Sequence, residues 1–204
     1  GLQGAGLWCE RWPRTRVRAM AGHYLEAVRE ARPHGPYLLG GYCMGGLVAL
    51  EMARRLQAQG ETVALLAVLD TPWPRMADRW RSFPHRVIDS VTRCRWSLRW
   101  APEILARRRQ APRLDARFRR HVEELHRLAF NRCRPRPYAG RAVAVIARDH
   151  ADYDRRRSEA FLHRAVPNAR IVNVPGTHLS CVTDALATKE IAAALEKSIA
   201  AKPH

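Results

Sequence analysis

Apolar runs of strand length alternate with segments of helical spacing along most of the chain, and this alternation restricts the possible folds more than any other feature. Residues 63–69 and 142–147 are unbroken apolar runs, residues 37–39 form a shorter one, and a further short strand is expected over 171–174. A strand that is apolar on both faces is buried on both faces, as in parallel sheets covered by helices. The sequence therefore predicts an α/β fold in which helices cover both faces of a mostly parallel sheet.

Helices are expected between these runs, where apolar residues recur at helical spacing. The four expected helices are one that starts near residue 17 and ends before Pro33, one from about 45 to a stop at Gly60, one over 155–165, and one from about 183. No internal repeat or low-complexity linker divides the 204 residues. We therefore expect a single domain over 1–204, which is long enough for a sizeable core.

Residues 71–137 differ in character from the rest of the chain. This stretch contains no strand-like run and is dense in arginine, with recurring prolines. It also holds four of the six tryptophans, which are Trp73, Trp80, Trp96 and Trp100. Its composition predicts a helical insertion within the domain. Two roles remain open: a small helical subdomain held on the sheet by its aromatic residues, or a lid whose apolar inner face contacts substrate.

Charge and cysteine content narrow the classes of function. The formal net charge is +17, but no helix-turn-helix, zinc-finger or RNA-binding motif accompanies it, so only the charge supports a nucleic-acid partner and we expect none. The five cysteines include no C-x-x-C pair, which favours reduced thiols, a cytoplasmic location and no structural metal. No apolar run reaches the ~18 to 20 residues of a membrane helix, so no membrane partner is expected.

The segment 41–46, Gly-Tyr-Cys-Met-Gly-Gly, lies where the first strand-like run gives way to a helix. This is the G-x-S-x-G nucleophile elbow of the α/β-hydrolase fold, with Cys43 in place of serine. A nucleophile on such a sharp turn needs small neighbours two residues away on either side, here Gly41 and Gly45. The turn also directs the N–H of Met44, near a helix N-terminus, at the oxyanion of acyl transfer. We therefore predict Cys43 as nucleophile and Met44 as oxyanion donor.

A base and an acid are expected at the same edge of the sheet. Of the nine histidines, His178 directly follows the last strand-like run and is last in chain order, as the hydrolase pattern requires. Asp70 ends the strand after the elbow helix, and Asp149 ends the next strand, with Asp152 close behind. Either strand end can bring a carboxylate to the imidazole. His178 is therefore the predicted base, and the residues alone leave the acid open.

Five segments form a combination typical of one family: 35–41, 43–53, 66–71, 134–138 and 175–178. Together they resemble the terminal thioesterase domains of polyketide and nonribosomal peptide synthetases, over most of the chain except the insertion. In that family the acid usually follows the strand after the elbow helix, which favours Asp70. Stand-alone editing thioesterases place it one strand later, which keeps Asp149 as the alternative acid. Most members carry serine at the elbow, so Cys43 marks a minority variant.

The resemblance implies a thioesterase that releases an acyl, polyketide or peptidyl chain from the phosphopantetheine arm of an acidic carrier protein. Release would use a Cys43-linked acyl-enzyme and end in hydrolysis or cyclisation. The resemblance implies no cofactor beyond the carrier's 4′-phosphopantetheine, and no metal. Family domains begin several dozen residues earlier, with further strands and a loop that supplies a second oxyanion N–H. A chain that starts at Gly1 is therefore expected to lack both.

Two alternatives to this function remain. Dienelactone hydrolases carry a similar Gly-Tyr-Cys elbow, with the acid later in the chain, so another hydrolase with a cysteine elbow is one alternative. The other is a catalytically incomplete domain that binds a carrier protein through its arginines.

Overall fold

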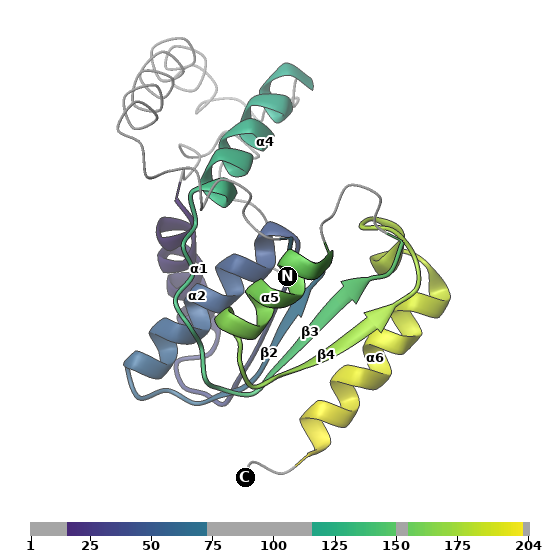
Figure 1. Ribbon diagram of the computed structural model, residues 1–204. Helices are drawn as coiled ribbons and strands as arrows, with labels where there is room; N and C mark the ends of the chain where they lie inside the picture. Colours follow the sequence, from purple (N-terminus) through teal and green to yellow (C-terminus); the bar gives the residue numbers. More distant parts are fainter. Residues whose placement is uncertain (1–15, 73–115, 150–154, 202–204) are drawn as a thin grey trace. The chain divides into compact units, whose positions relative to one another are not determined.

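The computed structural model describes residues 16–72, 116–149 and 155–201 (Figure 1). Its strands form one four-stranded sheet and are β1 (Tyr37–Tyr42), β2 (Val63–Leu69), β3 (Ala142–Ala147) and β4 (Ala169–Val174). The helices of the described residues are α1 (Val17–Ala31), α2 (Met44–Ala58), α4 (Ala116–Asn131), α5 (Arg155–Ala165), the short 3-10 helix η1 (Ser180–Val182) and α6 (Ala185–Ala200).

The strands pair in parallel in the order β1-β2-β3-β4. Because all four run in the same direction, their carboxyl ends meet at one edge of the sheet. There the register places Tyr42 beside Leu69, Leu69 beside Val145, and Ala147 beside Val174. Segments that follow the strands are thereby brought together, although they lie far apart in the sequence.

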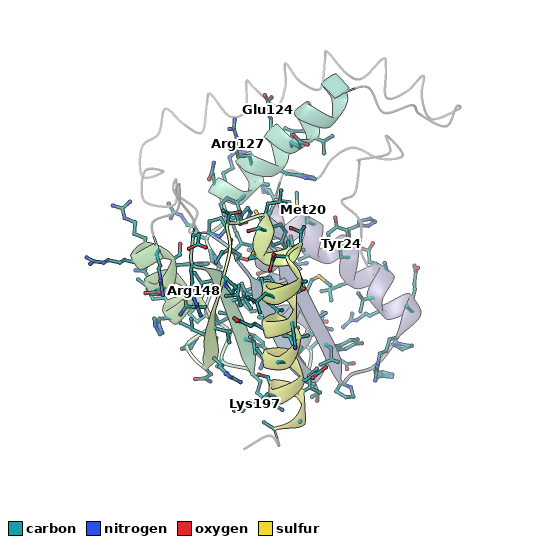
Figure 2. All side chains as sticks on the ribbon, turned by 90° about the vertical axis from the view of Figure 1, so that its right-hand side faces the viewer. Met20, Tyr24, Glu124, Arg127, Arg148 and Lys197 are labelled. Carbon is teal, nitrogen blue, oxygen red and sulfur yellow. The ribbon has the colours of Figure 1, made fainter. Side chains whose placement is uncertain are left out.

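Helices cover both faces of this sheet, so the predicted α/β class is confirmed. On one face, Val143 and Val174 pack with Ile191 of α6, which lies in front of the strands in Figure 2. On the opposite face, α2 approaches so closely that a Cβ added at Gly46 would lie 3.1 Å from Val68 Cγ1. α2 and α5 each connect consecutive parallel strands, and right-handed crossovers place both on the same face.

Two compact units make up the chain. Among the described residues, one unit contains 21–72 and 135–201 and carries the whole sheet, and the other contains 16–20 and 116–134, including α4. Most of the expected insertion, with its four tryptophans, falls within 73–115 and lies outside the described residues. Its role as a lid therefore stays a prediction.

The strands confirm most of the predicted bounds. β2 and β3 begin and end at the predicted residues. β1 continues beyond the predicted 37–39 because Gly40 and Gly41 stay extended and pair with β2. β4 begins at Ala169, before the predicted start at 171. The charged residue Arg170 separates Ala169 from the predicted segment, which is why the start of β4 was placed too late.

The helices also follow the predictions, with one shift. Gly60 lies just past the end of α2 with a φ of 79°, a left-handed conformation that glycine adopts easily. α6 begins at Ala185 rather than near 183, because the carboxylate of Asp184 accepts hydrogen bonds from the first N–H groups of that helix. Within the described ranges, no helix is both long and apolar enough to cross a membrane.

Candidate active site

The turn between β1 and α2 holds Cys43 in a backbone conformation that side-chain-bearing residues rarely adopt. Its φ is 54° and its ψ is −122°, and it directly precedes Met44, the first residue of α2. Strained residues of this kind persist only where their surroundings fix them, and they concentrate at functional sites. The turn has the strand-to-helix geometry of a nucleophile elbow.

Two glycines make this turn possible, and one of them differs from the expectation. A Cβ at Gly41 would lie 2.1 Å from the carbonyl carbon and oxygen of Gly45, and a Cβ at Gly46 would lie 2.0 Å from Thr71 Oγ1. The same construction at Gly45 meets nothing within 4 Å. A Cβ can therefore be accommodated at position 45, and the close approach that requires glycine on the helix side occurs one residue later, at Gly46.

The Cys43 thiol is half-buried at the N-terminal end of α2. Burial raises the pKa of the Cys43 thiol, a hydrogen bond from the backbone N–H of Met44 lowers it, and the charge of Asp70 adds a further increase. At neutral pH the thiol is therefore protonated and needs a base to become a nucleophile. The Met44 N–H already lies beside the sulfur, so it can also reach an oxygen on a carbon bonded to that sulfur.

Asp70 directly follows β2 and is fully buried, with a left-handed φ of 42°. Its Oδ1 accepts a hydrogen bond from the Ala147 N–H at 2.9 Å, and its Oδ2 lies 2.6 Å from His178 Nδ1. A carboxylate beside Nδ1 keeps the proton on that nitrogen and leaves Nε2 as the acceptor. The structure therefore brings Asp70 and His178 together in the geometry of an acid that orients a base.

His178 lies in the loop between β4 and η1, and three contacts from Tyr42 and Cys181 hold it. Its ring stacks on the ring of Tyr42, with centroids 4.7 Å apart and planes 24° from parallel. Its carbonyl oxygen accepts hydrogen bonds from the Tyr42 hydroxyl at 2.6 Å and from the Cys181 thiol at 3.2 Å. Because Tyr42 directly precedes Cys43, these contacts place the imidazole at the same edge of the sheet as the thiol.

Asp149, the alternative acid, binds the backbone of the same loop. Its Oδ2 accepts a hydrogen bond from the Gly176 N–H at 3.1 Å, and its own N–H donates to the Gly176 carbonyl at 3.1 Å. Gly176 has a φ of 98°, so the loop turns sharply at this point. Asp149 thus holds the loop that carries His178, while Asp70 binds the imidazole itself. The neighbouring Asp152 lies outside the described residues.

Cys43 and Asp70 are also linked through the backbone. The Cys43 N–H donates to the Leu69 carbonyl at 2.9 Å, and the buried hydroxyl of Thr71 donates to the Cys43 carbonyl at 2.8 Å. These two bonds reach the residues immediately before and after Asp70. These bonds therefore hold the nucleophile turn and the end of β2 in a fixed position relative to each other.

A family model for the thioesterase domain matches residues 9–199. The chain belongs to the thioesterase domain family. It is thus a hydrolase that acts on thioesters, and the resemblance to thioesterase domains of polyketide and nonribosomal peptide synthetases is confirmed.

Curated relatives of this thioesterase domain are much longer proteins. The polyketide synthase PksR of Bacillus subtilis (strain 168) is 38% identical over 73 residues, which are 36% of this chain and 3% of PksR. The matched part is therefore a small fraction of the relative.

Solved structures share the fold. The NocB thioesterase domain, in covalent complex with a fluorophosphonate nocardicin G analog, superposes with a TM-score of 0.61 at 26% identity, over 91% of this chain and 75% of that chain. The RedJ thioesterase of the prodiginine pathway in Streptomyces coelicolor superposes with a TM-score of 0.61 at 21% identity, over 97% of this chain and 77% of that one. These similarities support the predicted α/β-hydrolase fold of the thioesterase domain.

Sequence reasoning missed three residues that hold the site of this thioesterase domain together. Tyr42 and Thr71 are the chain neighbours of the predicted nucleophile and the favoured acid, and that adjacency was a signal that could have found them. Cys181 had no such signal, because a buried cysteine in a short loop is usually a small apolar residue of the core.

Proposed function

We propose that this thioesterase domain releases an acyl or peptidyl chain from the phosphopantetheine arm of a carrier protein, with Cys43 as nucleophile, His178 as general base and Asp70 as the orienting acid. One observation carries the proposal. The buried carboxylate of Asp70 lies 2.6 Å from the imidazole of His178, whose ring stacks on the residue directly before Cys43. Three side chains from distant parts of the sequence thereby share one edge of the sheet.

The first stage forms the acyl-enzyme. Nε2 of His178 takes the thiol proton of Cys43, and the sulfur attacks the thioester carbonyl as the carbonyl electron pair moves to oxygen. The Met44 N–H donates to that oxyanion. When the intermediate collapses, the bond to the pantetheine sulfur breaks, and the leaving thiolate takes the proton from His178. The acyl chain is then bound to Cys43.

The second stage releases the chain. His178 takes a proton from water, or from a hydroxyl or amine of the chain itself, and the activated oxygen or nitrogen attacks the Cys43 thioester. Collapse of this intermediate breaks the bond to Cys43, whose sulfur takes the proton back from His178. Water gives a free acid and an internal nucleophile gives a ring. A thioester intermediate stays activated toward either attacker.

The proposed partner is an acidic acyl or peptidyl carrier protein, and the proposed steps draw on no metal or cofactor of the domain itself. The net charge of +17 favours association with an acidic protein surface. Among the described residues, Cys43, Cys133 and Cys181 are free thiols, which suits a reducing compartment such as the cytoplasm.

Alkylation and substitution of Cys43 test the nucleophile. In the full chain, iodoacetamide is expected to label Cys43 fastest among the cysteines, and Cys43→Ala is expected to abolish both this labelling and the hydrolysis of an acyl-pantetheine thioester. Cys43→Ser should lose the labelling yet retain measurable hydrolysis, since a hydroxyl in the same place can still attack. Peptide mapping identifies the labelled cysteine, and release of free pantetheine thiol gives the turnover.

Unchanged thioester turnover in Cys43→Ala would end this mechanism. A lactone serves as the second substrate, because a hydrolase of the dienelactone type would prefer it to the thioester. Such enzymes place their acid later in the chain, whereas the acid that binds His178 here follows β2. A carrier-binding domain without catalysis would bind the carrier but hydrolyse neither substrate.

A further inference from the structure

Tyr42 ends β1 and directly precedes the nucleophile turn. Its side chain lies on the face of the sheet that α6 covers, in contact with the cluster that contains Cys181 and Val174. From this position it contacts His178 twice, once through the ring and once through the hydroxyl. No step of the proposed reaction uses Tyr42, so these two contacts have a purpose other than chemistry on the substrate.

The two contacts restrict different motions of His178. The hydrogen bond that Nδ1 of His178 donates to Asp70 fixes the position of Nδ1 but leaves the imidazole free to turn about that bond. Stacking on Tyr42 fixes the plane of the ring, with centroids 4.7 Å apart. The Tyr42 hydroxyl, at 2.6 Å from the His178 carbonyl, holds the backbone from which the ring extends.

The hydroxyl of Tyr42 stays protonated, and so remains a donor, well above neutral pH. Burial raises the pKa of Tyr42 to about 12, and the neighbouring Cys43, Cys181 and Asp70 add to the increase. The second donor to the same carbonyl, the thiol of Cys181, is also held protonated, because burial raises its pKa to about 11. The backbone of His178 is therefore held by two donors that do not titrate near neutral pH.

We infer that Tyr42 is a positioning residue that aims Nε2 of His178 at the thiol of Cys43. This inference rests on the roles proposed above for Cys43 and His178. Because Tyr42 is bonded covalently to Cys43, any small movement of the nucleophile turn carries the imidazole with it. Proton transfer needs Nε2 of His178 and the sulfur of Cys43 within hydrogen-bond reach, so the link through Tyr42 helps to keep these two atoms at that distance. The aromatic face also favours the imidazolium that forms when the proton arrives.

Two substitutions separate the ring of Tyr42 from its hydroxyl. Tyr42→Phe keeps the stacked ring and is expected to slow iodoacetamide labelling and thioester turnover at neutral pH by less than about 10-fold, the worth of one hydrogen bond. Tyr42→Leu removes both contacts and is expected to slow them by about 10²-fold, because an unaligned base loses its catalytic contribution. Tyr42→Met, which fills similar space without a ring, replaces Tyr42→Leu if that variant does not fold.

The pH dependence of labelling distinguishes positioning from a general structural role. The titratable groups in contact with His178 include Asp70, Cys181 and Tyr42, and the proposed reaction adds the thiol of Cys43. Near neutral pH the thiol needs the base, whereas above its own pKa it reacts as free thiolate. We therefore expect the rate deficit of Tyr42→Leu to be large at neutral pH and to close as the pH rises past the thiol pKa.

Tyr37→Leu is the matched control, because Tyr37 lies at the other end of β1 and its hydroxyl donates to the carbonyls of Arg32 and Pro33. It should lower the melting temperature without altering the shape of the pH profile. The inference is overturned if the labelling rate of Tyr42→Leu is reduced by the same factor at all pH values. It is also overturned if Tyr42→Leu has the wild-type rate at every pH. Failure of the proposed function gives a different result: with Tyr42 unchanged, the Cys43→Ala variant would keep both the fast labelling and the thioester turnover.

Discussion

At the scale of single residues, Asp70 illustrates how one side chain can serve both the fold and the site. Its two carboxylate oxygens have different partners, the Ala147 N–H and the imidazole of His178, and both partners are donors. A carboxylate accepts from both at once. A side-chain amide has one acceptor oxygen and one donor NH2 group. It would therefore direct its NH2 at either the Ala147 N–H or the His178 Nδ1–H, and two donors cannot form a hydrogen bond.

This asymmetry predicts opposite outcomes for two similar substitutions. Asp70→Asn is expected to lower thioester turnover by about 10²- to 10⁴-fold, because the amide disfavours the tautomer that leaves Nε2 as acceptor. Asp149→Asn is expected to keep near-native turnover, since the amide oxygen can still accept from the Gly176 N–H. Steady-state kinetics with an acyl-pantetheine substrate measures both. A larger loss in Asp149→Asn than in Asp70→Asn would move the acid to Asp149.

At the scale of elements, the join between β1 and α2 is governed by backbone approach. Gly41 lies against the backbone of Gly45, and Gly46 lies against the Thr71 side chain, which itself binds the Cys43 carbonyl. Neither neighbour can retreat cheaply, because one is helix backbone and the other is fully buried. Gly45 has open space around its Cα.

The three glycines therefore predict a graded series of stabilities. Gly41→Ala and Gly46→Ala are expected to destabilise the fold by at least about 1–3 kcal/mol, the usual cost of overpacking. Gly45→Ala is expected to be neutral or stabilising, since alanine in a helix is favoured over glycine by about 1 kcal/mol. Chemical unfolding followed by circular dichroism gives the three values. A Gly45→Ala variant as unstable as the other two would contradict the assigned geometry of the turn.

The sequence allowed most elements to be predicted, because their signals are local. β2 and β3 are unbroken apolar runs, and their bounds follow directly from composition. The choice between Asp70 and Asp149 was not local, since both end buried strands and only the spatial placement of the His178 loop separates them. The resemblance favoured Asp70. The contacts of Tyr42, Thr71 and Cys181 depend on packing between distant segments, which periodicity does not encode.

At the scale of the whole molecule, the site makes stability depend on pH in the alkaline range. The pKa of Cys181 is raised from 9.0 to about 11, chiefly by burial and further by the charge of Asp70. Burial likewise raises the pKa of Tyr42 to about 12 and raises that of Cys43. In each case the folded protein keeps a proton that the unfolded chain releases.

The sign of the effect follows from this difference. Below pH 9.0 both states hold the Cys181 proton, so its contribution to stability is complete; from there to about pH 11 only the unfolded chain ionises, and the contribution is lost. The melting temperature is therefore expected to fall over this range, and less steeply in Cys181→Ala than in the parent protein. Calorimetry under reducing conditions measures the slopes, with Cys133→Ala as control. Equal slopes for the parent and Cys181→Ala would refute the assignment.

The hydrogen bonds from Cys43 to Leu69 and from Thr71 to Cys43 make formation of the active centre depend on assembly of the sheet. They form only when the end of β1 is in register with the end of β2, and parallel strands meet late because a whole crossover must close first. A refolding chain whose helices have formed but whose strands β1 and β2 are not yet aligned would hold the Cys43 thiol and the Asp70 carboxylate on unconnected segments. Enzymatic turnover during refolding should thus return no earlier than the burial of the Cys43 amide, so recovered catalysis reports that β1 and β2 have paired.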